Sequence, residues 1–129
     1  MSQPLALIIE DETDLGEIFS MALQAAGYET QQAFTGPDAL TKLAGCAPDL
    51  VVLDLHLPGL DGGQVLKDIR RDARLRRTRV MLATADAAFA RTLEKEADFV
   101  LLKPISFSQL RDLARRLKPN PPGEPGVGA

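Results

Sequence analysis

The chain has 129 residues, of which 45% are hydrophobic and 26% are charged, with a formal net charge of −3. This length suits one domain that can bury a core of its own, and the acidic balance argues against a general affinity for nucleic acid or for an anionic membrane. The single cysteine excludes an internal disulfide, and no apolar run approaches the roughly 18 residues of a membrane-spanning helix.

Short apolar runs alternate five times with longer amphipathic stretches, a pattern that is typical of strand–helix units. The second run is the most polar, so we expect that strand at an edge of the sheet. In chain order the pattern predicts strand 5–9, helix 14–26, strand 29–33, helix 37–46, strand 50–53, helix 61–72, strand 79–83, helix 87–95, strand 99–102 and helix 106–118.

The predicted helix ends rest on local capping signals. Gly27 is the expected stop of the first helix, and Pro37 suits the first turn of the second. Three pairs have the spacing at which a side chain caps the start of a helix: Asp14 with Glu17, Asp61 with Gln64, and Ser106 with Gln109.

Continuous apolar strands joined by helices predict a doubly wound α/β fold, in which helices cover both faces of a parallel sheet. We expect this folded domain to occupy residues 1–118. The remaining residues, 119–129, are rich in proline and glycine and are expected to form a disordered tail or a linker. The apolar run at 5–9 is too short for an export signal and lacks a basic leader, so we expect a cytoplasmic protein.

Charged and polar side chains follow the predicted strands at the points where they end. Glu10 and Asp11 follow the first strand, Asp54 the third, Thr84 the fourth and Lys103 the fifth. Each residue alone has an ordinary explanation as a turn or loop residue. Ligands of such sheets bind outside the carboxyl ends of the strands. Polar or charged residues at four of these strand ends together predict a functional site.

The residue types at this edge favour phosphoryl chemistry. Clustered carboxylates repel one another and need a cation, and their oxygens suit Mg²⁺. Lys103 adds a point charge suited to a phosphoryl group. Asp54 is ionised at neutral pH without a general base, so it can act as a nucleophile. The set therefore predicts an aspartyl phosphate on Asp54.

These residues lie in motifs that resemble the receiver domain of two-component response regulators. The motifs are LALIIEDE, VVLDLHLPGLDG, VMLATAD and VLLKP, and the resemblance covers about residues 5–118. It implies a flavodoxin-like fold with strand order 2-1-3-4-5. It also implies that a sensor histidine kinase or a phosphotransfer protein passes a phosphoryl group to Asp54, which switches partner binding.

The resemblance implies a metal site as well. By position, Asp11 and Asp54 would bind Mg²⁺ directly, and Glu10 would support the ion through water. The backbone carbonyl of His56 would be the remaining protein ligand.

Further roles follow from the family by position. Thr84 and Lys103 would bind the phosphoryl oxygens, and Thr84 would report their arrival. The His56 side chain and Asp86 would tune dephosphorylation, and a cis peptide bond would precede Pro104.

The sequence departs from the family pattern near the fifth strand. Receivers usually have Tyr or Phe three residues before the lysine, where this chain has Val100. Phe99 is adjacent, but strand alternation points it to the other face, so it does not substitute. This places the usual switch mechanism, in which that aromatic residue rotates inward, in question for this chain.

Three alternatives to this function stay open. A phosphohydrolase of the haloacid dehalogenase type also uses an aspartate nucleophile, but it needs an acid where this chain has His56. We therefore expect no enzyme activity beyond self-phosphorylation and slow self-dephosphorylation. A pseudo-receiver would bind partners without phosphate. The basic stretch 67–79 could contact nucleic acid or an acidic partner, although a solvated surface is the favoured reading.

The output stays open too. No output domain is evident after residue 118, and the chain reads either as a stand-alone regulator or as part of a longer one. We expect no direct nucleic-acid binding by this domain and no membrane partner. A phosphorylation-dependent homodimer is one of the open alternatives.

Overall fold

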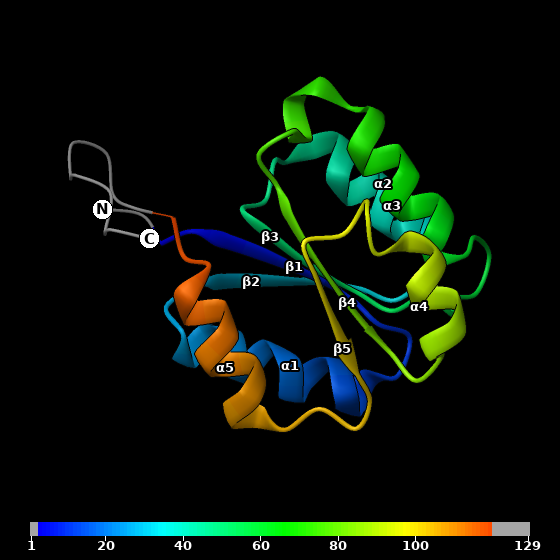
Figure 1. Cartoon of the computed structure of the whole chain (residues 1–129). Coiled ribbons are helices and arrows are strands. Elements are labelled where there is room, and N and C mark those ends of the chain that lie inside the picture. Colours follow the sequence, from blue (N-terminus) through cyan, green and yellow to red (C-terminus); the bar gives the residue numbers. More distant parts are fainter. Residues whose placement is uncertain (1–2, 120–129) are drawn as a thin grey trace.

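The computed structural model describes residues 3–119 and contains five strands and six helical segments within that range (Figure 1). The elements are β1 (Leu5–Ile9), α1 (Thr13–Ala25), β2 (Glu29–Ala33), α2 (Gly36–Gly45), β3 (Leu50–Leu53), α3 (Gly62–Arg71), the 3-10 helix η1 (Ala73–Leu75), β4 (Arg79–Thr84), α4 (Ala87–Leu93), β5 (Phe99–Leu102) and α5 (Phe107–Arg116).

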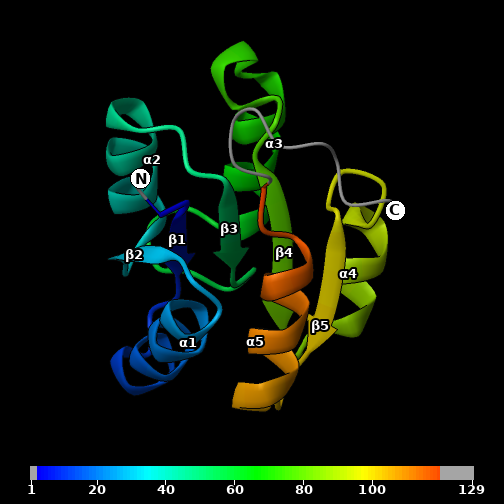
Figure 2. The same cartoon turned by 90° about the vertical axis from the view of Figure 1, so that its left-hand side faces the viewer.

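The five strands form one parallel sheet in the order β2-β1-β3-β4-β5, which confirms the predicted doubly wound fold. Figure 2 shows β2 at one edge of the sheet and β5 at the other. The polar strand is thus an edge strand, as its composition predicts. All four strand pairs are parallel, so the carboxyl ends of the strands meet along one edge.

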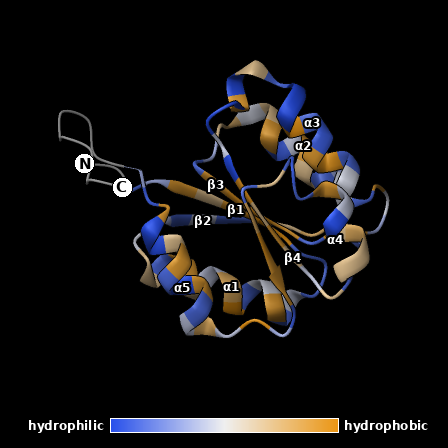
Figure 3. Ribbon diagram, viewed as in Figure 1, coloured by the Kyte–Doolittle hydropathy of each residue, from blue (hydrophilic) through white to orange (hydrophobic). Residues whose placement is uncertain are grey.

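Helices cover both faces of the sheet, and this explains the continuous apolar strands (Figure 3). Along β1, Leu7 and Ile9 belong to the core beneath α2, α3 and α4, whereas Ala6 and Ile8 belong to the core beneath α1 and α5. Because successive side chains of a strand point to opposite faces, every position of such a strand must be apolar.

The capping box predicted at Asp14 and Glu17 is wrong. Helix α1 begins at Thr13, and the cap residue Glu12 makes no side-chain hydrogen bond to the helix start. The turn after β1 has only three residues, so Asp14 already lies in the first helical turn, where its negative charge suits the helix dipole.

The other capping predictions are confirmed. The side chains of Asp61 and Ser106 accept hydrogen bonds from the backbone N–H groups of Gln64 and Gln109, at 2.9 and 3.0 Å. Gly27 ends α1 with a φ of 100°, a conformation that side chains disfavour.

Several predicted boundaries shift by one or two residues. Helices α4 and α5 end at Leu93 and Arg116, and β4 continues through Thr84, which pairs with Leu102 of β5. The expected tail lies outside the described residues except for Pro119. Within residues 3–119, no helix combines the length and the apolar character that crossing a membrane requires.

Gly62 lets the start of α3 approach the loop after β3. A Cβ atom on Gly62 would overlap the backbone carbonyl of Asp54. We expect Gly62→Ala to lower the free energy of unfolding by about 2 kcal/mol, because such overpacking displaces the backbone. Urea unfolding would measure this loss.

Gly45→Ala is the matched control, because a Cβ atom on Gly45 would meet nothing within 4 Å. That variant should keep or slightly raise stability, since alanine favours a helix over glycine. Equal stability of the two variants would contradict the steric argument for Gly62.

Candidate functional site

Three carboxylates lie together at the carboxyl edge of the sheet. Glu10 and Asp11 follow β1 and Asp54 follows β3, and one oxygen from each lies within 4.8 Å of the others. Glu10 and Asp54 are buried, with 2% and 6% of their surface exposed. Asp11 is exposed. Three negative charges at this spacing form a group that could hold a metal ion.

Lys103 supplies a positive charge to this cluster. Its Nζ donates a hydrogen bond to Glu10 Oε1 at 2.7 Å and lies 3.6 Å from Asp54 Oδ2. The lysine reaches the cluster from the end of β5, where its backbone N–H donates to the carbonyl of Thr84 at 2.9 Å. The ammonium group therefore sits between two carboxylates from different strands.

The position of Asp54 is fixed by its neighbours in the loops. Its backbone N–H donates to the Ile9 carbonyl at 2.9 Å, which continues the pairing of β3 with β1. Its Oδ1 accepts a hydrogen bond from the backbone N–H of His56 at 3.2 Å. One carboxylate oxygen is thus held by the loop, and the other faces Lys103.

Thr84 is fully buried at the end of β4. Its Oγ1 accepts a hydrogen bond from the backbone N–H of Asp86 at 3.1 Å, so its hydroxyl hydrogen stays available as a donor. The Lys103–Pro104 peptide bond that follows β5 is cis.

The side chains of His56 and Asp86 contact each other, which the sequence did not predict. His56 Nε2 lies 3.0 Å from Asp86 Oδ2, and the ring centroids of His56 and Phe89 are 6.0 Å apart. The hydrogen bond from the Phe89 backbone N–H, together with His56, lowers the pKa of Asp86. Phe89 carries no sequence signal for this place, because the packing of α4 puts it there.

Strand β5 has two different faces. Phe99 packs against the core beneath α1 and α5, whereas Val100 is 36% exposed and Leu102 is 50% exposed. The structure therefore places Val100 on the opposite face from Phe99, as strand alternation predicts.

Burial changes the protonation of the cluster. Burial raises the pKa of Glu10 to about 7, with the charge of Asp54 adding to the rise and the hydrogen bond from Lys103 opposing it. For Lys103, burial favours the neutral form, but the hydrogen bond and charge of Glu10 outweigh it and raise the pKa. Without a metal ion, Glu10 therefore carries a proton at mildly acidic pH.

This pKa predicts a pH dependence of stability in the absence of metal. The pKa of Glu10 is about 7 in the folded chain, against an ordinary value of 4.5. Between these values the folded chain binds more protons than the unfolded chain, so the Glu10 contribution is full below pH 4.5 and is lost as pH rises through 7. We expect a loss of about 3 kcal/mol.

Urea unfolding in a chelator at several pH values would measure this slope. Glu10→Gln should remove it, because the amide does not titrate. If the free energy of unfolding of Glu10→Gln changes with pH as it does in the wild type, another group is responsible for the pH dependence.

Comparison with known proteins shows the family to which the chain belongs. The family model described as "Response regulator receiver domain" matches residues 6–115. The curated DNA-binding dual master transcriptional regulator RpaA of Synechocystis sp. is 33% identical over 117 residues, which cover 88% of this chain and 48% of that protein. The chain thus spans about half the length of this relative.

Two solved structures share the fold. The chemotaxis response regulator CheY4 of Vibrio cholerae superimposes with a TM-score of 0.81 over 90% of this chain and 99% of that one, at 24% identity, which shows the fold alone. The response regulator TrrA of Thermotoga maritima, solved in complex with Mg²⁺–BeF, has a TM-score of 0.79 at 30% identity and covers 91% of this chain and 99% of that one. The chain belongs to the response regulator receiver domains of two-component signalling.

Proposed function

We propose that this receiver domain takes up a phosphoryl group on Asp54 in a Mg²⁺-dependent reaction. The observation that carries this proposal is the contact of Lys103 with both Glu10 and Asp54, at 2.7 and 3.6 Å, beside the exposed Asp11. A cation and a buried carboxylate nucleophile then face the same space, which a transferring phosphoryl group needs.

The donor set fits Mg²⁺. All three side chains offer carboxylate oxygens, the ligands that this hard ion prefers. Asp11 and Asp54 would hold the ion directly with the His56 carbonyl, and Glu10 would hold it through water. When bound, Mg²⁺ neutralises charge on the phosphoryl oxygens. The relative TrrA was solved with Mg²⁺–BeF, which supports this choice of ion.

The transfer itself is carried by the protein's own groups. An ionised oxygen of Asp54 forms a bond to phosphorus while the phosphorus–nitrogen bond to the donor histidine breaks, and the released imidazole takes up a proton. Lys103 and the Thr84 hydroxyl bind the phosphoryl oxygens. No side chain need remove a proton from Asp54, because its carboxylate is the nucleophile.

The output of this switch is a change in partner binding. Phosphorylation replaces one negative charge on Asp54 with nearly two, and Lys103 and Thr84 rearrange around the new oxygens. Val100 occupies the position of the usual aromatic residue and already lies partly in solvent, so we infer a switch that works without inward rotation of a ring.

The proposed partners follow from the chemistry. The donor is a sensor histidine kinase or a phosphotransfer protein, and phosphorylation-dependent homodimerisation is one form the output can take. The proposed receiver unit occupies residues 1–118, and residues 119–129 serve as a tail or linker. The proposed location of the protein is the cytoplasm.

Intact mass spectrometry tests the proposal directly. The chain is incubated with acetyl phosphate, in Mg²⁺ or in a chelator. We expect a mass gain of one phosphoryl group only with Mg²⁺. No gain in either condition would overturn the proposal and favour a module that binds partners without phosphate.

The contact of His56 with Asp86 should control the lifetime of the phosphoryl group. His56 belongs to the loop that holds Asp54, and its ring lies near Phe89, so we expect His56→Ala to admit water and shorten that lifetime by about three- to tenfold. Loss of the mass gain over time would measure it. Asp86→Ala should have a similar effect if the pair acts together, and a lifetime unchanged in both variants would contradict this role.

A further inference from the structure

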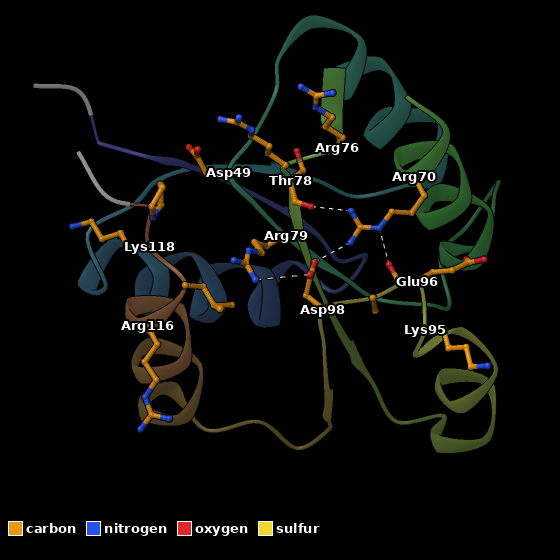
Figure 4. A pocket seen from close by; sticks show the side chains of 14 residues that line it. Asp49, Arg70, Arg76, Thr78, Arg79, Lys95, Glu96, Asp98, Arg116 and Lys118 are labelled. Atoms are coloured by element: carbon orange, nitrogen blue, oxygen red, sulfur yellow. Dashed lines mark hydrogen bonds and ion pairs between the residues drawn. The ribbon is translucent and has the colours of Figure 1, made fainter. Parts of the chain in front are cut away.

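A broad groove lies at the edge of the sheet opposite the carboxylate cluster (Figure 4). It has a volume of about 980 Å³ and forms where β3, β4 and β5 begin and α5 ends. Its lining comes from separate parts of the chain: Asp49, Arg70, the segment 76–79, the segment 95–98, and the segment 116–119.

Positive charge dominates this groove. Seven lining residues are basic and three are acidic, so the lining carries an excess of four positive charges although the whole chain is negative. The basic residues are Arg70, Arg76, Arg77, Arg79, Lys95, Arg116 and Lys118. The fold therefore concentrates cations that the sequence distributes over nearly fifty residues.

Two of the three acidic residues have structural partners. Asp98 accepts hydrogen bonds from the Val80 backbone N–H at 2.7 Å and from Arg70 at 2.8 Å. Asp49 accepts from the backbone N–H of Leu5 at 2.8 Å. Asp98 also lies 4.0 Å from Arg79, so its charge is directed to Arg70 and Arg79 rather than to the outer cations.

Arg70 links the elements that form the floor of the groove. Its guanidinium also donates to the carbonyl oxygens of Thr78 and Glu96, at 2.9 and 2.6 Å, and so joins α3 to the starts of β4 and β5. Figure 4 shows Arg70 and Arg79 pointing inward toward Asp98.

The remaining cations are available to a ligand. Within residues 3–119, five of them form no ion pair and no side-chain hydrogen bond: Arg76, Arg77, Lys95, Arg116 and Lys118. In Figure 4, the charged ends of Lys95, Arg116 and Lys118 lie apart from one another, and Arg116 points along α5 away from the centre of the groove. Such spread charges suit an extended anion rather than a compact one held at a single point.

We propose that this groove docks an acidic, extended segment of a partner protein with about four or more Asp or Glu residues. Guanidinium groups match carboxylates in shape, and four excess positive charges complement such a segment. The groove lies at the opposite ends of the strands from Asp54, about 20 Å away along six-residue β4. A docked segment therefore leaves the phosphorylation site open.

The lining favours a peptide over nucleic acid. It contains no aromatic residue on which a base could stack. Three carboxylates lie among the cations, and the chain as a whole carries a net charge of −3, which repels a long polyanion.

Fluorescence anisotropy with a labelled peptide of alternating glutamate and glycine tests this site on the full chain. We expect binding at low ionic strength that weakens with salt and is absent for the matched glutamine peptide. The double variant Arg76→Glu/Arg77→Glu should bind the glutamate peptide about tenfold or more weakly than the wild type. Both arginines are exposed, so their reversal leaves the core intact.

The matched control is Lys67→Glu/Arg71→Glu, which reverses two exposed cations of the same basic stretch outside the groove. The affinity of this control variant for the glutamate peptide should stay within about twofold of the wild-type affinity. Absence of binding at low salt, or an equal loss in the two double variants, would overturn the groove as a site. Tighter binding of duplex DNA than of the peptide through Arg76 and Arg77 would overturn the choice of ligand.

Discussion

Asp54→Asn is expected to gain no phosphoryl group from acetyl phosphate, whether or not Mg²⁺ is present. The amide has neither the charge nor the nucleophilic oxygen of the carboxylate. The fold should persist, because the variant removes one of three clustered negative charges from a buried site and keeps its shape. In a chelator at neutral pH, its free energy of unfolding should equal or exceed that of the wild type.

The control for this variant is Asp112→Asn, on the exposed surface of α5. It should gain phosphate like the wild type. Intact mass measures uptake, and urea unfolding verifies the fold. A mass gain in Asp54→Asn at the wild-type rate would show that another residue, such as Asp11, is the acceptor.

Lys103→Met is expected to slow phosphorylation of Asp54 by about a hundredfold or more, since it removes the cation aimed at the phosphoryl oxygens. Removal of the lysine should also lower the stability of the fold, because the buried Glu10 carboxylate then lacks the ammonium group that lies 2.7 Å from it. In a chelator at pH 8, we expect the free energy of unfolding to fall by about 2–3 kcal/mol. This decrease in the free energy of unfolding should be smaller at pH 5, where Glu10 is protonated.

Lys42→Met provides the matched control. Lys42 also contacts a carboxylate, Asp38, at 3.1 Å, but the pair is about one-third exposed on the surface of α2. Its loss should cost less than about 1 kcal/mol and leave phosphorylation unchanged. Equal effects of the two substitutions on phosphorylation would remove Lys103 from the proposed site.

The sequence by itself determined the architecture and the edge of the sheet at which the site lies. The apolar runs are continuous because both faces of the strands are covered, so they fix which segments are strands. Parallel strands bring all their carboxyl ends to one edge, so the residues that follow them, such as Asp11 and Asp54, must lie near that edge. Capping by Asp61 and Ser106 was also predictable, since it acts between residues three apart.

The start of α1 was not predictable from the local capping pattern, because the length of the preceding turn determines it. Asp14 and Glu17 have the spacing of a capping box, yet the short turn after β1 starts the helix at Thr13. The pattern of residues along a segment does not say how tightly the preceding strand end must turn.

Only the tertiary structure decided which side chains meet. Lys103 and Glu10 are 93 residues apart in the chain, and their contact and burial set a pKa that no local pattern predicts. The same holds for His56 with Asp86, and for the groove that collects cations from separate segments. The physical reason is that periodicity reports which face of an element is buried, whereas contacts between elements depend on the packing of the whole sheet and its helices.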